Sequence, residues 1–136
     1  MTDKELLELA AKAAGITGWQ SKHGYWNMKD IDGIDVVCCS NWPRFDSNTG
    51  QELNPTFSDA IEELNWNPLT DDGNALRLAV KLGIQVLPNY KSASGKLMTW
   101  AGIGMQTIYE PHDEDAMEAT RRAIVKAAAL IGKDLK

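Results

Sequence analysis

Apolar side chains are spaced in two ways along this chain, and the spacing predicts where helices and strands lie. Repeats of three and four residues indicate helices, whereas short apolar runs between turn residues indicate strands. The predicted helices cover residues 3–14, about 56–64, 70–82 and about 113–131. The predicted strands cover residues 25–28, 34–39, 84–87, 97–101 and 105–109.

Residues at the predicted helix and strand ends support these limits. Thr2 with Glu5, and Thr56 with Asp59, have the spacing of a capping box, in which each residue's side chain bonds the other's backbone N–H. The segment 30–33 ends in Asp-Gly between two apolar runs, a strong hairpin signal. We therefore expect the strands at 25–28 and 34–39 to pair in antiparallel orientation.

The third helix is expected to begin at Thr70, whose hydroxyl can accept from the first backbone N–H groups. Leu76, Ala79, Val80 and Gly83 recur at helical spacing and predict its buried stripe. Leu78 and Leu82 widen the stripe, so we expect this helix to be largely covered. Gly83 is also expected to end the helix in a left-handed conformation. Pro88 and the residue after it are expected to break the following strand.

The last helix is expected to run to about residue 131 and to end at Gly132. Arg121 and Arg122 lie off its predicted apolar stripe. That stripe consists of Ala116, Thr120, Ala123, Ile124, Ala127, Leu130 and Ile131.

Together these elements predict an α+β fold: a mostly antiparallel sheet of four to five strands packed by three or four helices. A length of 136 residues suits a single domain, and we expect one over residues 1–136. No apolar run approaches the ~20 residues of a membrane span, and the N-terminus lacks the pattern of a signal peptide. These observations predict a cytosolic protein without a membrane partner.

Part of the chain also resembles a known group of proteins. The segment Trp66–Leu82 reads WNPLTDDGNALRLAVKL and is similar to the signature of small, uncharacterised proteins of tailed bacteriophages and prophages. Residues 3–16 and 119–125 resemble the same group, and the order of elements is loosely similar to the phage α-β-α (ABA) sandwich domain family. The resemblance implies a phage product in the bacterial host cytoplasm and helices on both sheet faces, as a three-layer α-β-α sandwich. It implies no reaction, cofactor or ligand.

Charge and cysteine content narrow the possible functions. A net charge of −5 makes sequence-independent binding to nucleic acid unfavourable, because neutralising phosphates requires a basic surface. Cys38 and Cys39 are adjacent and point to opposite faces if they lie in a strand, so we expect free thiols. The two cysteines could form a zinc site with His23 and His112, but these four residues lack the sequence spacing that is typical of zinc ligands. No metal or other cofactor is therefore expected.

Two charged pairs suggest chemistry but also have structural explanations. Asp71 and Asp72 could act with His112 in an enzyme, but carboxylates at a helix start are explained by the helix dipole. Arg121 and Arg122 could clamp a phosphate, but surface arginines commonly form ion pairs. We expect no catalytic residues, and leave open a small-molecule or nucleotide-binding protein that uses the arginine pair and tryptophans.

The most suggestive feature is a long polar loop at residues 40–54 that contains Trp42, Arg44 and Phe45. Aromatic and arginine side chains dominate the energetically important positions of protein interfaces. The alternative is that the loop folds its aromatic side chains back over the sheet. We expect a non-enzymatic protein that binds a host protein, as in host takeover or counter-defence, through this loop, with Trp19 or Trp26 as additional contacts. A homodimer formed through the loop is a further option.

Overall fold

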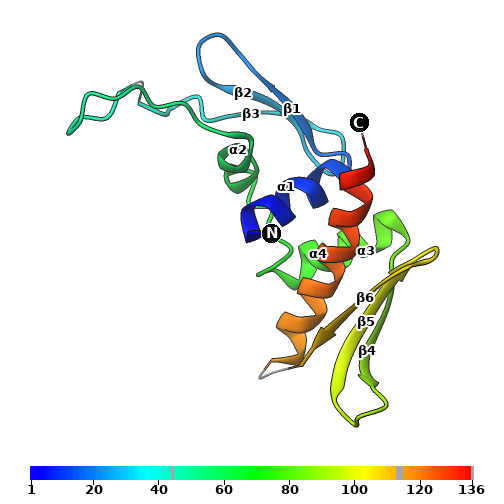
Figure 1. Ribbon diagram of the computed structural model, residues 1–136. Coiled ribbons are helices and arrows are strands. Elements are labelled where there is room, and N and C mark those ends of the chain that lie inside the picture. The colour runs from blue at the N-terminus through cyan, green and yellow to red at the C-terminus, as the bar shows by residue number, and fades with distance from the viewer. Residues whose placement is uncertain (44, 113–114, 136) are drawn as a thin grey trace. The chain divides into compact units, whose positions relative to one another are not determined.

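The structure is a computed structural model that describes residues 1–43, 45–112 and 115–135 (Figure 1). The helices in this part of the chain are α1 (Asp3–Ala13), α2 (Phe57–Glu63), α3 (Asp72–Leu82) and α4 (Ala116–Asp134). The strands are β1 (Thr17–Gln20), β2 (Trp26–Lys29), β3 (Asp35–Cys38), β4 (Gln85–Lys91), β5 (Leu97–Ile103) and β6 (Gln106–Pro111).

The α+β class is confirmed, but the predicted strand arrangement is wrong. The described residues form two three-stranded antiparallel sheets, β1-β2-β3 and β4-β5-β6, instead of one sheet of four to five strands. Strand β1 was not predicted, because its four residues include Gly18 and only one large apolar side chain, Trp19. β4 passes through Pro88 as an irregular edge strand, with Asn89 in a left-handed conformation (φ 61°), so these residues bend the strand without ending it.

The chain divides into two compact units. The first joins residues 1–14 to residues 67–136 and contains α1, α3, α4 and the sheet β4-β5-β6. The second covers residues 15–66 and contains α2 and the sheet β1-β2-β3. The expectation of a single domain over residues 1–136 stays a prediction.

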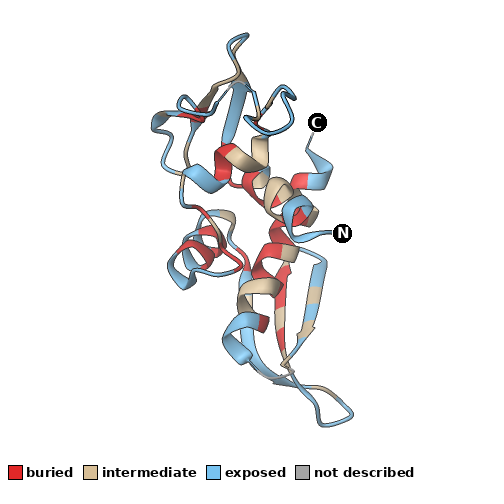
Figure 2. Cartoon of the chain, turned by 90° about the vertical axis from the view of Figure 1, so that its left-hand side faces the viewer, coloured by how far each residue is buried: buried red, intermediate tan, exposed pale blue. Residues whose placement is uncertain are grey.

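Helix α4 forms the centre of the first unit and contacts α1, α3 and the sheet β4-β5-β6. Between Ala119 and Ala129 its buried residues lie on almost every side of the helix, so the helix is covered more widely than the predicted stripe. Ala116, which the prediction placed in the stripe, is exposed. The buried residues are red in Figure 2. Half of the buried apolar side chains in the described part of the chain are alanines. These alanines are Ala10, Ala11, Ala14, Ala60, Ala75, Ala79, Ala101, Ala119, Ala123, Ala127, Ala128 and Ala129.

The sequence suggested that the last helix ends at Gly132, but Gly132 lies inside the helix. A Cβ atom at this position would overlap the backbone carbonyl group of Leu9 in α1. The two helix backbones therefore approach one another so closely that only glycine fits at this point. The need for a small residue comes from packing, and the helix continues to Asp134.

Helix α3 begins one residue later than predicted. The N-cap is Asp71, whose carboxylate accepts from the Asn74 backbone N–H at 3.3 Å. The hydroxyl of Thr70 lies 3.4 Å from the Asn67 carbonyl oxygen, to which it donates. Gly83 ends the helix in a left-handed conformation (φ 67°), as predicted.

The predicted buried stripe of α3 is correct for Leu78 and Ala79 but wrong for Leu76 and Val80. Ala75, Leu78 and Ala79 are buried, whereas Leu76 and Val80 are exposed. Both sets have helical spacing, so periodicity alone did not separate them. The covered face of α3 thus carries two alanines beside the fully buried Leu78.

In the second unit, α2 packs on one face of the β1-β2-β3 sheet. The rings of Trp26 and Phe57 lie 5.7 Å apart, and the Trp26 indole N–H donates to the Pro55 carbonyl at 2.9 Å. Met28 covers Gly18 of the neighbouring strand, where a Cβ atom would overlap the Met28 sulfur. The hairpin predicted around Asp32-Gly33 is confirmed.

Replacement of glycine by alanine is predicted to have opposite effects on the free energy of unfolding at two helical positions, because only Gly132 lies where α1 and α4 approach closely. Gly132→Ala is expected to lower the free energy of unfolding by about 3 kcal/mol, because the added methyl group meets the α1 backbone. Gly73→Ala in α3 is expected to raise it by up to about 1 kcal/mol, because its Cβ would meet only the Asp71 carboxylate, at 3.8 Å. Urea unfolding monitored by circular dichroism measures both, and equal effects of the two substitutions would contradict the close approach.

Candidate functional site

The loop between β3 and α2 exposes two aromatic side chains. Trp42 is 43% exposed and Phe45 is 57% exposed. The third residue predicted for this site, Arg44, lies outside the described residues. The exposure of Trp42 and Phe45 favours the interpretation that this loop presents aromatic side chains over the one in which it buries them.

The part of the loop that follows Phe45 is held by a hydrogen-bonded turn. The Asp46 carboxylate accepts from the backbone N–H groups of Asn48 (2.7 Å) and Thr49 (3.2 Å). The Asp46 backbone also bonds Gln51 and Gly50, each at 2.8 Å. Phe45 forms an isolated β-bridge with Glu52 at the base of this turn. The exposed ring of Phe45 therefore projects from a braced segment of backbone.

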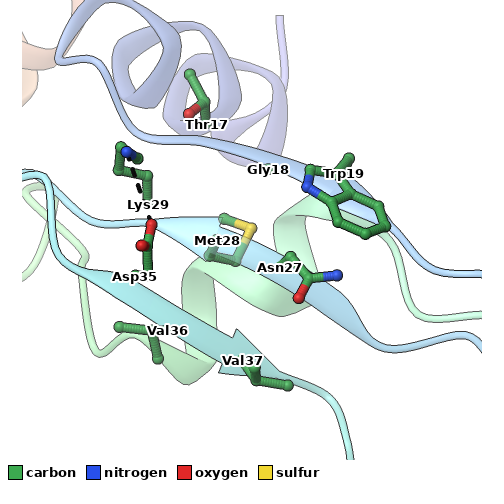
Figure 3. A pocket seen from close by; sticks show the side chains of 9 residues that line it. All are labelled: Thr17, Gly18, Trp19, Asn27, Met28, Lys29, Asp35, Val36 and Val37. Carbon is green, nitrogen blue, oxygen red and sulfur yellow. Dashed lines mark ion pairs between the residues drawn. The ribbon is translucent and has the colours of Figure 1, made fainter.

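A second exposed surface lies on the β1-β2-β3 sheet. Cross-strand pairing places Trp19, Asn27 and Val37 side by side, and Thr17, Lys29 and Asp35 next to them on the same face. Figure 3 shows these side chains around an open hollow of about 480 Å³. The Lys29 ammonium and the Asp35 carboxylate, 3.6 Å apart, form an exposed ion pair at one end of this surface.

Trp19 and Asn27 give this surface its chemical character. Trp19 is 64% exposed, although indole is among the most apolar side chains. The side-chain nitrogen of Asn27, directly opposite Trp19, is buried and has no hydrogen-bond partner among the described residues. An unpartnered buried amide is costly, and the exposed indole of Trp19 next to Asn27 offers a flat aromatic surface on which a planar ligand can stack.

The sequence suggested Trp19 only as an additional contact and did not single out Asn27 or Val37. These three residues are distant in sequence and share one face only because of the strand register. The signal that could have revealed them is the run Thr17-Gly18-Trp19-Gln20, in which alternation places Thr17 and Trp19 on one face of a strand. Recognising that alternation would have identified β1 and its pairing with the predicted hairpin.

The guanidinium group of Arg121 is bound to the segment that precedes and begins α3. Its Nε donates to the Leu69 carbonyl at 2.8 Å, and its Nη1 lies 2.7 Å from the Asp72 carboxylate. The side chain is only 17% exposed. Arg121 therefore connects α4 to the start of α3.

Arg122 binds a different element. Its guanidinium group faces the Asp3 carboxylate with N–O distances of 3.1 and 3.5 Å. The hydrogen bonds to Asp3 raise the pKa of Arg122. Both arginines thus neutralise carboxylates of their own chain, and the prediction that they bind a phosphate gains no support from these contacts.

The groups considered for catalysis have separate structural partners. Asp71 caps α3 and Asp72 pairs with Arg121. The ring nitrogen Nε2 of His112 lies 2.6 Å from the Thr99 hydroxyl, which lies 2.9 Å from the Thr120 hydroxyl. Asp71, Asp72 and His112 therefore each support the fold through contacts of their own.

The direction of these hydrogen bonds can be assigned. Thr120 donates its proton to the Ala116 carbonyl at 2.8 Å, so it must accept from Thr99. Thr99 has then used its only proton and must accept from His112. His112 consequently carries a proton on Nε2, and it cannot activate the Thr99 hydroxyl as a nucleophile in this arrangement.

The adjacent cysteines are free and buried. The Cys39 backbone N–H donates to the Glu63 carboxylate at 2.6 Å. Burial, together with a hydrogen bond from the thiol to Glu63, raises the pKa of Cys39 to about 12, and burial also raises the pKa of Cys38. Within the described residues, no three His, Cys, Asp or Glu side chains are grouped so that they could hold a metal ion.

Comparisons of the chain with protein-family models, curated proteins and solved structures give no match. In the part of the chain that the structure describes, no helix combines the length and apolar character needed to span a membrane.

The Arg121 contacts predict a structural effect of its removal. Arg121→Ala is expected to lower the free energy of unfolding by about 2 kcal/mol, because the Leu69 carbonyl and Asp72 lose their partner. Arg77→Ala, at an exposed site on α3, is the matched control and should change it by less than about 0.5 kcal/mol. Chemical denaturation measures both, and equal values for the two variants would contradict the structural role of Arg121.

The raised pKa of the Cys39 thiol predicts that the free energy of unfolding depends on pH. Its pKa is raised from 9.0 to about 12, so its contribution to stability is complete below pH 9 and is lost as the pH rises toward 12. Between pH 9 and 11 the free energy of unfolding should fall more steeply in the natural protein than in Cys39→Ala. Iodoacetamide at pH 8.5 should alkylate Cys39 in the unfolded chain only, and rapid alkylation of the folded protein would refute the raised pKa.

Proposed function

We propose that this chain is a non-enzymatic accessory protein that binds a host protein through the aromatic loop at residues 40–54. The observation that carries the proposal is the exposure of Trp42 and Phe45 beside a hydrogen-bonded turn. Large aromatic side chains bury much surface with little loss of conformational freedom, so they dominate many interfaces. A braced loop reduces the entropy cost of binding further.

The biological setting is part of the same proposal. The resemblance of residues 66–82 to a signature of tailed-phage and prophage proteins supports a phage product that acts in the host cytoplasm, in host takeover or counter-defence. The looser resemblance implies a three-layer α-β-α arrangement, but Leu87 and Tyr109 on the outer face of the β4-β5-β6 sheet are half exposed, so the proposal does not include it. A homodimer through the loop is the other outcome that the exposed aromatic side chains permit.

The hollow on the β1-β2-β3 sheet favours a second candidate function, the binding of a small molecule. Trp19 offers an exposed ring, and Asn27 has an unpartnered amide beside it. Because Arg121 and Arg122 are engaged elsewhere, a ligand here would not depend on the arginine pair. A thermal-shift screen of nucleotides and neutral ring compounds tests this candidate, since a ligand stabilises the protein that binds it.

The loop proposal predicts the loss of a partner without loss of the fold. Trp42→Ala combined with Phe45→Ala should remove specific partners from affinity purifications out of infected or prophage-carrying cells. The control is Met105→Ala, because Met105 is fully exposed and lies between β5 and β6. Unchanged partners in the loop variant, with circular dichroism showing an intact fold, would refute the proposal.

A further inference from the structure

The net negative charge of the chain lies in one of its two units. In the first unit, residues 1–14 and 67–136, eleven lysine and arginine residues balance eleven aspartate and glutamate residues. In the second unit, residues 15–66, three lysine and arginine residues stand against eight aspartate and glutamate residues. The second unit therefore has the whole net charge of −5, and a partner that binds it approaches an acidic body.

Most of this charge lies in the loop after β3 and in the helix that follows it. Residues 39–66 contain one arginine and five carboxylates, which give this segment a net charge of −4. Three of the carboxylates accept hydrogen bonds from backbone N–H groups, which are neutral donors and leave the negative charge in place. The five carboxylates are those of Asp46, Glu52, Asp59, Glu62 and Glu63.

Phe45 and Glu52 place an aromatic ring and a carboxylate side by side in this loop. The two residues are partners in an isolated antiparallel β-bridge. Directly opposed residues of such a pair have their Cβ atoms about 5 Å apart on the same face. Phe45 is 57% exposed, and Glu52 is exposed as well. Glu52 belongs to none of the ion pairs formed among the described residues, so both groups are presented to a partner together.

A ring beside a carboxylate suits a cationic group. A guanidinium or ammonium group within about 6 Å of a ring centroid is attracted by the negative face of the ring. The carboxylate accepts charge-assisted hydrogen bonds from the same cation. Arginine fits both contacts better than lysine, because its guanidinium group is planar, stacks on rings and can donate to both oxygens of a carboxylate. Phe45 and Glu52 therefore favour an arginine of the partner.

The same charge disfavours other occupants of the loop surface. Residues 39–66 repel an acidic protein, because like charges that meet across an interface are costly. They also repel nucleic acid, whose binding requires neutralisation of its phosphates. In a two-fold dimer through the loop, two segments that each have a net charge of −4 would face one another. A basic partner is thus favoured over a second copy of this chain.

We propose that the partner bound by the loop at residues 40–54 is a protein with a basic segment, and that an arginine of this segment stacks on Phe45 and bonds the Glu52 carboxylate. This inference rests on the proposed function, the binding of a protein through the loop, and adds the chemistry of the partner. The charge of residues 39–66 steers the basic segment toward the loop, an effect that salt screens.

Fluorescence anisotropy of labelled peptides with the full chain tests the proposal. Four peptides of equal length and otherwise identical sequence carry arginine, lysine, glutamine or glutamate at the same positions. The first variant is Phe45→Leu, which removes the ring but keeps an apolar side chain. The second is Glu52→Gln, which removes the charge but keeps the shape. The control is Glu118→Gln, the same change at an exposed position of α4.

The arginine peptide is expected to bind best and the glutamate peptide least, and the difference should shrink between about 0.05 M and about 0.5 M salt. Phe45→Leu and Glu52→Gln should each weaken binding of the arginine peptide about threefold, whereas Glu118→Gln should leave it unchanged. The proposal is overturned if the arginine peptide binds no better than the lysine or glutamine peptide. It is also overturned if Glu118→Gln weakens binding as much as Glu52→Gln.

A second measurement separates failure of this inference from failure of the proposed function. Partners are purified from infected or prophage-carrying cells with the natural chain, with Glu52→Gln, and with Trp42→Ala combined with Phe45→Ala. If the double variant loses partners that Glu52→Gln retains even at about 0.5 M salt, the loop binds a partner that is not basic. The inference is then overturned while the proposed function stands. If the double variant retains every partner, both are overturned.

Discussion

The structure of the first unit depends on the close approach of neighbouring backbones to the backbone of α4. Gly132 meets the α1 backbone at Leu9, and alanines fill most of the remaining interface. Short side chains let helices and sheet approach closely, and dense packing over a long helix compensates for the small area that each alanine buries. Arg121 and Arg122 then tie α4 to α3 and α1 by charged hydrogen bonds.

Most of the large aromatic side chains are found outside the interior of either unit. Trp66, in the second unit, is the one aromatic residue among the buried apolar residues described. Trp19, Trp42, Phe45, Tyr90 and Tyr109 are exposed instead. Aromatic side chains contribute most to stability when buried, so the exposure of Trp42 and Phe45 supports the proposal that they contact a partner.

The sequence predicted those features that depend on neighbouring residues. The capping boxes of Thr2 and Thr56 and the left-handed Gly83 were predicted correctly because each involves residues a few positions apart. The buried side of α3, the division into two sheets and the role of Gly132 could not be predicted, because they depend on which elements meet in three dimensions. Likewise, loop composition identified Trp42 and Phe45 as candidates but left open whether they are exposed or folded back over the sheet, and the Trp19–Asn27–Val37 surface required the strand register.

The central claim is that the exposed aromatic side chains contribute little to the stability of the fold. The most direct test is the free energy of unfolding of a chain in which Trp19, Trp42 and Phe45 are all replaced by serine, measured by urea denaturation with circular dichroism. The account predicts a value within about 1.5 kcal/mol of the natural protein, because each exposed substitution contributes only a few tenths. A loss of several kcal/mol would show that these rings belong to the core, and would contradict the claim.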